Sequence, residues 1–286
     1  MHYELIKFIF MIIVRLLGGI GNQLFQYSFG EYLKRETNQI VTYDIGTYGR
    51  SDKNRECGIR IINNDILTID NVKFSHYRGI KNRLYRFLFM LNKNNVYIDE
   101  SKMKDNLYFS DKLYYLQGYW QNTLYIDKSN DFFQPKESIP FEIESILKVI
   151  ENSIEPVFIH IRRGDYFSPK NQSIYGVCDA DYYHRAIRYM NDNVDYDRLF
   201  IFSDDYNWVK TNMILPNNIY FVPNCNVNHY WYIYLMSKCN HSIISNSTFS
   251  WWGAYLNEKS NKIVVAPKIW INGSNTTLAL TDWIKL

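Results

Sequence analysis

VFIHIRRGDY, at residues 157 to 166, is the stretch that decides the fold of this chain. Val157–Ile161 is an apolar run with β-branched members, which predicts a short buried strand. Arg162, Arg163 and Asp165 follow it, so two guanidiniums and a carboxylate are expected at the carboxyl end of a strand. Ligands bind at that end of the strands in open α/β sheets, so the stretch predicts an α/β fold with a binding site here.

Two adjacent arginines at this place suit a diphosphate. A guanidinium is always charged, and its planar fork donates two parallel hydrogen bonds to phosphate oxygens. A hydrogen bond to a charged group contributes about 1.5–3 kcal/mol, so Arg162 and Arg163 would supply much of the anchoring of a nucleotide. The alternative is a structural ion pair, in which Asp165 neutralises one arginine and water solvates the other. The spacing alone leaves both interpretations open.

The second half of the chain alternates between strand and helix patterns. After Val157–Ile161, strands are expected at residues 199 to 202, 219 to 222, 242 to 245 and 263 to 266. Helices are expected at residues 179 to 190, 207 to 212, 230 to 238 and 249 to 256. This alternation is typical of a parallel sheet with crossover helices.

The first half opens with a similar unit. A strand is expected at residues 11 to 17, and a glycine-rich turn then opens a helix in GGIGNQLFQYSFGEYLKRE, at residues 18 to 36. Another strand is expected at residues 39 to 43. The loop lacks the G-x-G-x-x-G dinucleotide fingerprint, but its backbone N–H groups and Asn22 offer neutral donors at a helix N-terminus. Ordinary turn chemistry is the alternative for such a loop alone.

Two α/β units of about equal size predict two Rossmann-like domains, residues 1 to 150 and 151 to 286, facing a cleft. Residues 44 to 110 are the least readable part, with one basic amphipathic helix at residues 81 to 91. We expect its apolar side to pack on the protein, and the alternative is that it faces a membrane. A strand at residues 113 to 117 then leads to an aromatic pair that suits either a sugar ring or the core.

Three strand ends in the second half carry polar side chains. They are His160 with the arginine pair, the run Ser203, Asp204 and Asp205, and the run Ser245, Asn246, Ser247 and Thr248. Because parallel strands end at the same edge of a sheet, we expect all three to meet in one crevice. In the last run, Ser247 or Thr248 is expected to cap a helix whose N–H groups face an anion.

No metal site is predicted. Two D-x-D patterns, at residues 179 to 181 and 195 to 197, resemble the motif that holds a divalent metal on nucleotide sugars. The first precedes a helix, where acids cap and complement the helix dipole, and the second falls in a loop. Arg162 and a helix N-terminus are expected to neutralise a diphosphate instead.

Composition excludes several classes of function. The formal net charge is +3, from 32 Lys and Arg against 29 Asp and Glu, and no basic run tracks a polyanion, so nucleic acid is not an expected partner. The four cysteines show no metal-ligand spacing, which predicts reduced thiols in a cytoplasm. Residues 5 to 17 are too short and too charged for a membrane span, and a short interfacial anchor is the alternative to a strand preceded by a loose extension.

The motifs resemble those of one family. HIRRGDY, at residues 160 to 166, resembles the H-x-R-R-x-D motif of α-1,2-, α-1,6- and protein O-fucosyltransferases. GGIGNQLFQYSFG, at residues 18 to 30, and LMSKCNHSIISNSTFSWWGAYL, at residues 235 to 256, are similar to the α-1,2-fucosyltransferase family, most closely to its bacterial members. The resemblance implies a GT-B enzyme that inverts the anomeric centre and uses no metal or other cofactor.

The resemblance also implies substrates. The donor would be GDP-β-L-fucose, and the acceptor would be the 2-hydroxyl of a terminal galactose in an O-antigen, another surface glycan or an oligosaccharide. The N-terminal domain would lie on the acceptor side, and the C-terminal domain would bind the donor. Transfer of another GDP-linked 6-deoxy sugar, such as colitose, and non-catalytic binding of a GDP-sugar or glycan are the alternatives. The expected location is the cytoplasm, with peripheral contact to the inner face of the membrane left open.

Roles for individual residues follow from the matched positions. Arg162 is expected to hold the β-phosphate, Arg163 to support it, and His160 to lie against the ribose or guanine. The residues expected to complete the donor pocket are Asp204, Asn246, Ser247, Thr248 and Phe249. Asn22 matches an asparagine that approaches the reacting centre in related protein O-fucosyltransferases. Asp165 is the candidate general base, and the alternative is that its carboxylate orients the arginines.

Overall fold

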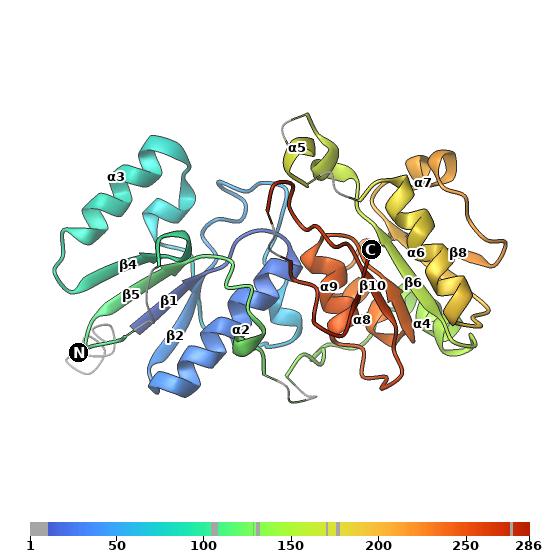
Figure 1. Ribbon diagram of the computed structural model, residues 1–286. Coiled ribbons are helices and arrows are strands. Elements are labelled where there is room, and N and C mark those ends of the chain that lie inside the picture. Colours follow the sequence, from blue (N-terminus) through green and yellow to red (C-terminus); the bar gives the residue numbers. More distant parts are fainter. Residues whose placement is uncertain are drawn as a thin grey trace. The chain divides into compact units, whose positions relative to one another are not determined.

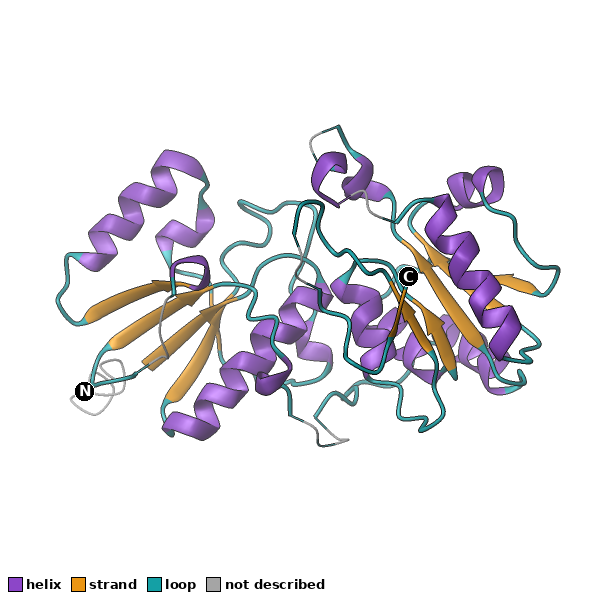
Figure 2. Ribbon diagram, viewed as in Figure 1, coloured by secondary structure: helices purple, strands orange, loops and turns teal. Residues whose placement is uncertain are grey.

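The computed structural model describes residues 11–103, 108–127, 129, 132–169, 171–175, 178–274 and 277–286. The chain divides into two compact units, Met1–Ser138 and Ile139–Leu286. Each unit holds one parallel sheet with helices packed beside it (Figures 1 and 2). The predicted fold class, two parallel α/β domains, is confirmed.

The sheet of the first unit has the strand order β3-β2-β1-β5-β4, and every pairing is parallel. Its strands are β1 (Met11–Arg15), β2 (Ile40–Asp44), β3 (Thr68–Ile69), β4 (Asn95–Asp99) and β5 (Leu113–Gln117). All five residues of β1 are buried, because this strand is hydrogen-bonded on both sides and covered on both faces.

Helices α2 (Ile20–Thr37) and α3 (Gly79–Met90) pack on opposite faces of this sheet (Figure 1). A close approach brings α2 to β2, because Gly30 lies against the ring of Tyr43. A Cβ atom added at Gly30 would lie 2.3 Å from the Tyr43 hydroxyl oxygen, so no larger residue fits here without a shift. On the other face, Tyr85 and Phe89 of α3 pack against a core cluster that includes Phe74.

The sheet of the second unit has the order β11-β10-β9-β6-β7-β8, again parallel throughout. Its strands are β6 (Val157–Ile161), β7 (Leu199–Ser203), β8 (Ile219–Phe221), β9 (His241–Ile243), β10 (Val264–Ala266) and β11 (Ile284–Lys285). The central strands β6 and β7 are buried along their whole length. The arginine pair directly follows the carboxyl end of β6.

The described residues of the second unit form six helices. They are α4 (Phe141–Glu151), α5 (Gln172–Tyr175), α6 (Ala180–Asn193), α7 (Tyr206–Asn212), α8 (Tyr230–Lys238) and α9 (Thr248–Tyr255). The boundary between the units falls between Ser138 and Ile139, upstream of the boundary at 150/151 expected from the sequence. The difference is the helix α4, which packs against α8 of the second unit and whose buried residues are Ile143, Ile146, Leu147 and Ile150.

Each sheet has a point where the chain changes its direction of growth. In the second sheet, the chain proceeds from β6 outward to β7 and β8 and then returns to place β9 on the other side of β6. In the first sheet, the corresponding point lies between β1 and β5. Open α/β sheets bind ligands outside the carboxyl ends of the strands at such points. The residues that follow β1, β5, β6 and β9 are therefore the first candidates for a site.

Candidate functional site

The turn after β6 is organised by Asp204, which follows β7. Asp204 Oδ2 lies 2.6 Å from Arg162 Nη1, and Asp204 Oδ1 accepts a hydrogen bond of 2.8 Å from the backbone N–H of Arg163. The Arg162 side chain keeps 30% of its surface exposed and the Asp204 side chain keeps 26%. The ion pair is thus open to a ligand from the solvent side.

The side chain of Arg163 packs against a different residue from that of Arg162. Its guanidinium carbon lies 3.9 Å from the centre of the Trp208 ring, in a cation–π contact. Trp208 is in the first turn of α7, and its backbone N–H donates to the capping carboxylate of Asp205. Asp204 therefore holds Arg162 and Trp208 holds Arg163, and both of these partners follow β7.

Gly164 makes the approach of Asp204 to this turn sterically feasible. A Cβ atom at position 164 would lie 2.5 Å from Asp204 Oδ2, the same oxygen that pairs with Arg162. The glycine begins the 3-10 helix η5 (Gly164–Phe167). Any larger residue would displace the carboxylate or the turn.

His160, in β6, is buried beneath the arginines. Its Nδ1 lies 3.0 Å from Ser245 Oγ, and its ring centre lies 5.4 Å from that of Phe249. Burial, together with the positive charge of Arg162, lowers the pKa of His160 to about 3. The imidazole is therefore neutral at physiological pH, and it links β6 to the segment after β9.

The segment after β9 contributes the N-terminus of α9. Ser247 is the N-cap, and its hydroxyl accepts a hydrogen bond of 3.3 Å from the backbone N–H of Phe249. This agrees with the predicted capping role of the Ser247–Thr248 turn. The positive end of the helix dipole therefore lies beside the switch point of the second sheet, where it favours an anion.

The side chain of Asn246 is engaged within the protein. Its Nδ2 donates to the carbonyls of Tyr175 at 3.0 Å and Trp270 at 2.9 Å, and its Oδ1 lies 3.4 Å from Cys178 Sγ. Asn246 thereby ties the segment after β9 to the end of α5, to the residue before the cap of α6 and to the segment after β10. Its predicted role in contacting a ligand stays a prediction.

The structure brings the predicted residues of the second unit together in part. His160 lies in β6 one residue before its end, and the other residues of the set follow the carboxyl ends of β6, β7 and β9: Arg162, Arg163, Asp204 and the segment from Asn246 to Phe249. The side chain of Asp165 lies outside the described part of the structure, so its proposed role as a base stays a prediction. Asp204 pairs with Arg162, and the alternative in which Asp165 neutralises an arginine also stays a prediction.

Two aromatic residues of this site were missed from the sequence. Trp208 packs against the guanidinium of Arg163, and the ring of Tyr166 lies 5.6 Å from the guanidinium carbon of Arg162. Tyr166 is inside the quoted motif, and Trp208 lies one helical turn after the polar end of β7. Their positions beside two cations could have been suspected, but only the pairing of β6 with β7 shows which ring meets which arginine.

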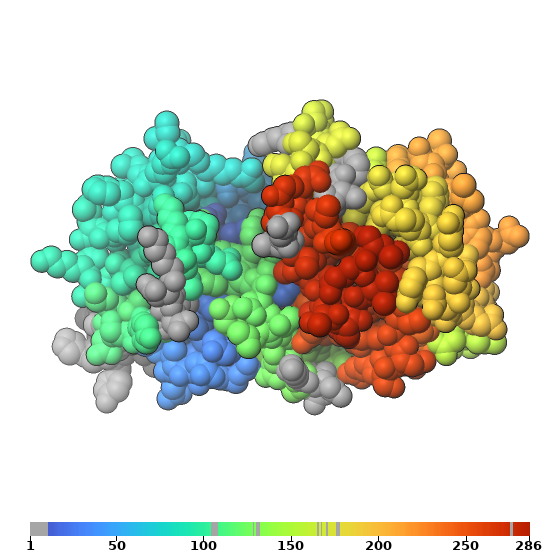
Figure 3. Space-filling view, viewed as in Figure 1, coloured from blue at the N-terminus to red at the C-terminus, as the bar shows by residue number. Residues whose placement is uncertain are grey.

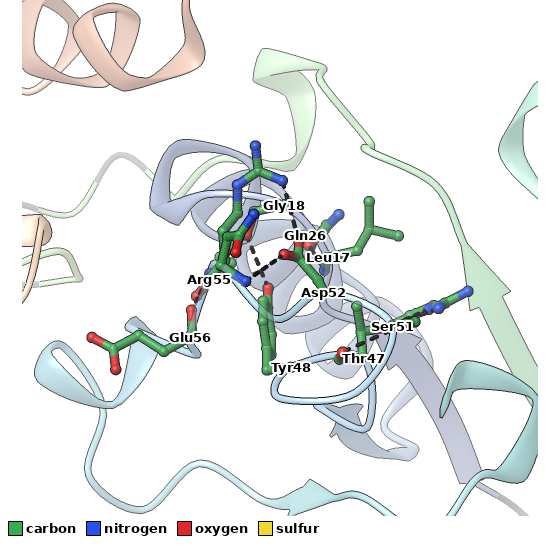
Figure 4. Close-up of polar contacts among 12 residues, drawn as sticks. Leu17, Gly18, Gln26, Thr47, Tyr48, Ser51, Asp52, Arg55 and Glu56 are labelled. Atoms are coloured by element: carbon green, nitrogen blue, oxygen red, sulfur yellow. Dashed lines mark hydrogen bonds and ion pairs between the residues drawn. The ribbon is translucent and has the colours of Figure 1, made fainter. Parts of the chain in front are cut away.

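The glycine loop of the first unit is held by side chains from the loop that follows β2. Tyr48 donates from its hydroxyl to the Gly18 carbonyl at 3.2 Å, and Arg55 Nη1 lies 3.1 Å from Asp52 Oδ2 (Figure 4). Gly18 has a φ of 81°, a conformation that favours glycine. Its carbonyl also accepts a hydrogen bond of 3.1 Å from Gln23 Nε2.

Asn22 lies in the first turn of α2. Its Oδ1 accepts a hydrogen bond of 3.1 Å from Gln121 Nε2, which comes from the segment after β5. Gln26, one turn further along α2, donates to the Gly118 carbonyl at 3.0 Å. The loops after β1 and β5 are thus joined at the switch point of the first sheet, and the reactive role expected of Asn22 stays a prediction.

A buried polar network supports these loops from below. Arg15, at the end of β1, donates to Thr47 Oγ1 at 3.0 Å and to Gln117 Oε1 at 2.5 Å. Asp44, at the end of β2, accepts from the Tyr115 hydroxyl at 2.5 Å, and burial raises the pKa of its carboxyl above the usual value. A satisfied network of this kind fixes the ends of β1, β2 and β5 rigidly.

Other sequence expectations concern single residues. Asp179, the first residue of one D-x-D pattern, caps α6 by accepting a hydrogen bond of 2.9 Å from the backbone N–H of Tyr182, as expected. Trp120 belongs to the core, since it is 1% exposed and stacks on Phe29 with a ring separation of 4.0 Å. In the described part of the chain, no helix combines the length and apolar character needed to cross a membrane.

Comparison with known proteins gives consistent matches. The family model described as "Glycosyl transferase family 11" matches residues 58–286. The O-antigen biosynthesis glycosyltransferase WbnK of Escherichia coli is 35% identical over 301 residues, which cover 95% of this chain and 99% of that protein. An alpha-1,2-colitosyltransferase of Escherichia coli is 31% identical over 280 residues, covering 91% of this chain and 92% of that protein.

A solved structure with a similar fold is that of NodZ alpha-1,6-fucosyltransferase, co-crystallized with GDP. The TM-score is 0.52 and the sequence identity is 12%, with 85% of this chain and 91% of that chain covered. At this identity the similarity concerns the fold.

Proposed function

The chain belongs to glycosyl transferase family 11, and on this premise we propose that it moves L-fucose from GDP-β-L-fucose to the 2-hydroxyl of a terminal galactose. The product is an α-1,2 linkage in an oligosaccharide or a surface glycan such as an O-antigen. The similarity to WbnK over nearly the full length of both chains supports the glycan class of the acceptor. The GDP in the NodZ crystals supports a GDP-linked donor.

The observation that carries the proposal is the turn after β6. Arg162 and Arg163 lie at the switch point of a parallel sheet, beside the N-terminus of α9. We expect a diphosphate there to meet the Arg162 guanidinium and the positive end of α9, with Arg163 held beside them by Trp208. The second unit is accordingly the donor-binding unit of the proposal, and the first unit is its acceptor side.

Loss of GDP is the step for which this arrangement is suited. As the bond from the fucose C1 to the diphosphate loosens, the sugar becomes oxocarbenium-like and negative charge grows on the β-phosphate. Arg162 would take that charge directly, because its ion pair with Asp204 is open to solvent on one side. The acceptor hydroxyl attacks the opposite face of C1, so the anomeric configuration inverts.

The base that takes the acceptor proton is assigned to Asp165, with Asn22 orienting groups at the reacting centre. The pH–rate profile of Asp165→Asn tests the assignment, because a base titrates in the acidic limb. Loss of that limb supports a base. An unchanged limb with a lower plateau supports the alternative, in which the carboxylate positions the arginines.

A second candidate function is transfer of colitose instead of fucose. The specific observation in its favour is the 31% identity to the alpha-1,2-colitosyltransferase over 92% of that protein. Colitose and fucose are both 6-deoxy sugars, so one nucleotide pocket would serve either donor. The difference must be read by groups around the sugar ring.

A screen of donors against acceptors tests the proposal. The purified protein is incubated with GDP-fucose, GDP-colitose or GDP-mannose and with lactose or other galactose-terminated oligosaccharides, and products are read by mass spectrometry. We expect a fucosylated product that an α-1,2-specific fucosidase cleaves. A colitosylated product alone would replace the first candidate by the second.

The matched control is Arg162→Ala, which removes the proposed contact to the diphosphate and leaves both sheets and their helices in place. It should release no GDP under conditions in which the parent protein does. If the parent protein binds GDP-fucose with no transfer to any acceptor, it is a non-catalytic binding protein and the proposal fails.

We also place the reaction in the cytoplasm. All four cysteines, at positions 57, 178, 225 and 239, carry free thiols. Cysteines left unpaired throughout a chain of this size fit a reducing compartment.

A further inference from the structure

Helix α3 in the first unit has two apolar faces. Tyr85 and Phe89 face inward and pack against the cluster around Phe74, and the side chain of Asn82 donates to the Phe74 carbonyl at 2.6 Å. These contacts fix the helix on the sheet. We expected the apolar side of this helix to pack on the protein. Only some of its apolar residues do so.

The opposite face of α3 is apolar and exposed. Its residues and their exposed fractions are Ile80 83%, Leu84 54%, Phe87 56%, Leu88 49% and Leu91 62%. Their spacing places them together on one stripe of the helix. No residue of α3 is buried. The space-filling view shows this helix, in cyan, on the outer surface of the first unit (Figure 3).

Basic residues are concentrated in the segment that carries the exposed stripe. The segment from residue 71 to residue 98 contains six Lys and Arg and no Asp or Glu, whereas the whole chain has a net charge of only +3. The six are Lys73, Arg78, Lys81, Arg83, Arg86 and Lys93. All except Arg86 are exposed, and Arg86 lies over the ring of Tyr97 at 4.8 Å.

We propose that this α3 surface docks on an anionic lipid bilayer. An exposed stripe of Leu, Ile and Phe with cations along its borders suits the boundary between acyl chains and negatively charged headgroups. The helix would lie in the plane of the interface while Tyr85 and Phe89 keep it attached to the protein. The inference does not depend on the identity of the donor or the acceptor.

Charge decides between a lipid surface and a second copy of the chain. In a symmetric dimer through α3, the same patch would meet itself and bring two sets of five exposed cations together. Such like-charge contacts are unfavourable, whereas anionic headgroups neutralise them. An anionic membrane is therefore the occupant that matches both the apolar stripe and its border.

Co-sedimentation with vesicles tests the proposal on the full chain. We expect binding to vesicles of phosphatidylcholine mixed with phosphatidylglycerol and little binding to phosphatidylcholine alone. Binding should fall between about 50 mM and about 500 mM salt, because salt screens the attraction of exposed charges. Equal binding to both vesicle types, or to neither, would overturn the proposal.

Matched variants assign the binding to α3. Leu84→Glu with Phe87→Glu should weaken vesicle binding at least tenfold, and Lys81→Glu with Arg83→Glu should do the same at low salt. The control is Ile154→Glu with Ile214→Glu, which places the same two charges on exposed apolar residues of the second unit, 70% and 81% exposed. Unchanged binding in both α3 variants would show that another surface is responsible.

Two further measurements keep the result interpretable. Circular dichroism and transfer to a soluble acceptor should be unchanged in the α3 variants, since none of the substituted residues lies in the proposed site. Sedimentation velocity without lipid distinguishes the rival occupant. A dimer that Leu84→Glu with Phe87→Glu converts to a monomer would replace the membrane by a second copy of the chain.

Discussion

Asp204 is the residue on which the candidate site depends, because it contacts both arginines of the turn after β6. One carboxylate oxygen pairs with the Arg162 side chain, and the other accepts from the Arg163 backbone. The sequence predicts that these residues follow neighbouring strands. It does not predict the pairing, because Asp165 is adjacent in sequence, whereas the register of β6 against β7 sets Ile161 opposite Ser203 and so brings Asp204 to Arg162.

Arg162→Lys should reduce the rate of transfer about a hundredfold, with a smaller effect on acceptor KM. A lysine carries the charge but cannot present a planar fork to both Asp204 and a phosphate oxygen. Steady-state kinetics measure the effect. Arg185→Lys, at an exposed position on α6, is the matched control and should behave as the parent protein. Near-normal turnover of Arg162→Lys would remove this residue from the proposed mechanism.

The protonation of His160 predicts a pH dependence of stability. Burial keeps its pKa at about 3 in the folded protein, whereas an unfolded histidine titrates near pH 6.5. Between these values only the unfolded chain takes the proton, so the contribution is complete above pH 6.5 and is lost as the pH falls toward 3. From pH 6.5 to 4.5 the loss is about 2–3 kcal/mol.

Urea unfolding at pH 6.5, 5.5 and 4.5 measures this loss. His160→Gln cannot take up the proton, so its free energy of unfolding should fall less steeply over the same range. Parallel curves for the parent protein and the variant would show that His160 does not cause the dependence. The three pH values lie between the pKa of His160 in the folded protein and its pKa in the unfolded chain.

At the scale of elements, the apolar runs predict most of the sheet and helix layers. The strands at 113–117 and 157–161 and the helix at 230–238 have the bounds expected from the sequence. The pattern fails for β3 and β11, which have two residues each and show no period. It also fails for β4, a half-buried edge strand in the part of the chain that was hardest to interpret.

The contact between α2 and β2 carries a prediction at this scale. Gly30→Ala should lower the free energy of unfolding by about 1–3 kcal/mol, because its Cβ would overlap the Tyr43 side chain in a packed core. Chemical denaturation measures the change. Glu36→Ala, on an exposed part of α2, should change the value by less than about 0.5 kcal/mol. An equal effect of the two substitutions would contradict the close packing at Gly30.

At the scale of the whole molecule, the fold class could be predicted because strands and helices alternate in both halves. The boundary between the units is harder to predict, since the expected division at 150/151 lies at the end of α4, whereas the first unit ends at Ser138. What decides the boundary is the burial of Ile143, Ile146 and Ile150 of α4 in the second unit. Such a preference depends on which core accepts a helix, and its amphipathic pattern is the same in either case.

The proposed chemistry predicts that chelation of metals leaves the enzyme active. Transfer should change less than about twofold when EDTA is added or when Mg²⁺ or Mn²⁺ is supplied, because guanidiniums and a helix N-terminus take the charge of the diphosphate. In the described residues, no cluster of three or more His, Cys, Asp or Glu side chains is placed to hold a cation. Loss of activity in EDTA that Mn²⁺ restores would show that a metal shares this task.

The ion pair between Arg162 and Asp204 also has a consequence for selectivity. Asp204 and Asp205 offset the two positive charges of Arg162 and Arg163 even before Asp165 is counted, so the segments after β6 and β7 carry no net positive charge. A simple anion such as inorganic phosphate therefore gains little from entering, since it meets as many carboxylates as guanidiniums. Tight binding requires a ligand whose base and sugar add contacts of their own, which allows the protein to ignore the abundant small anions of the cell.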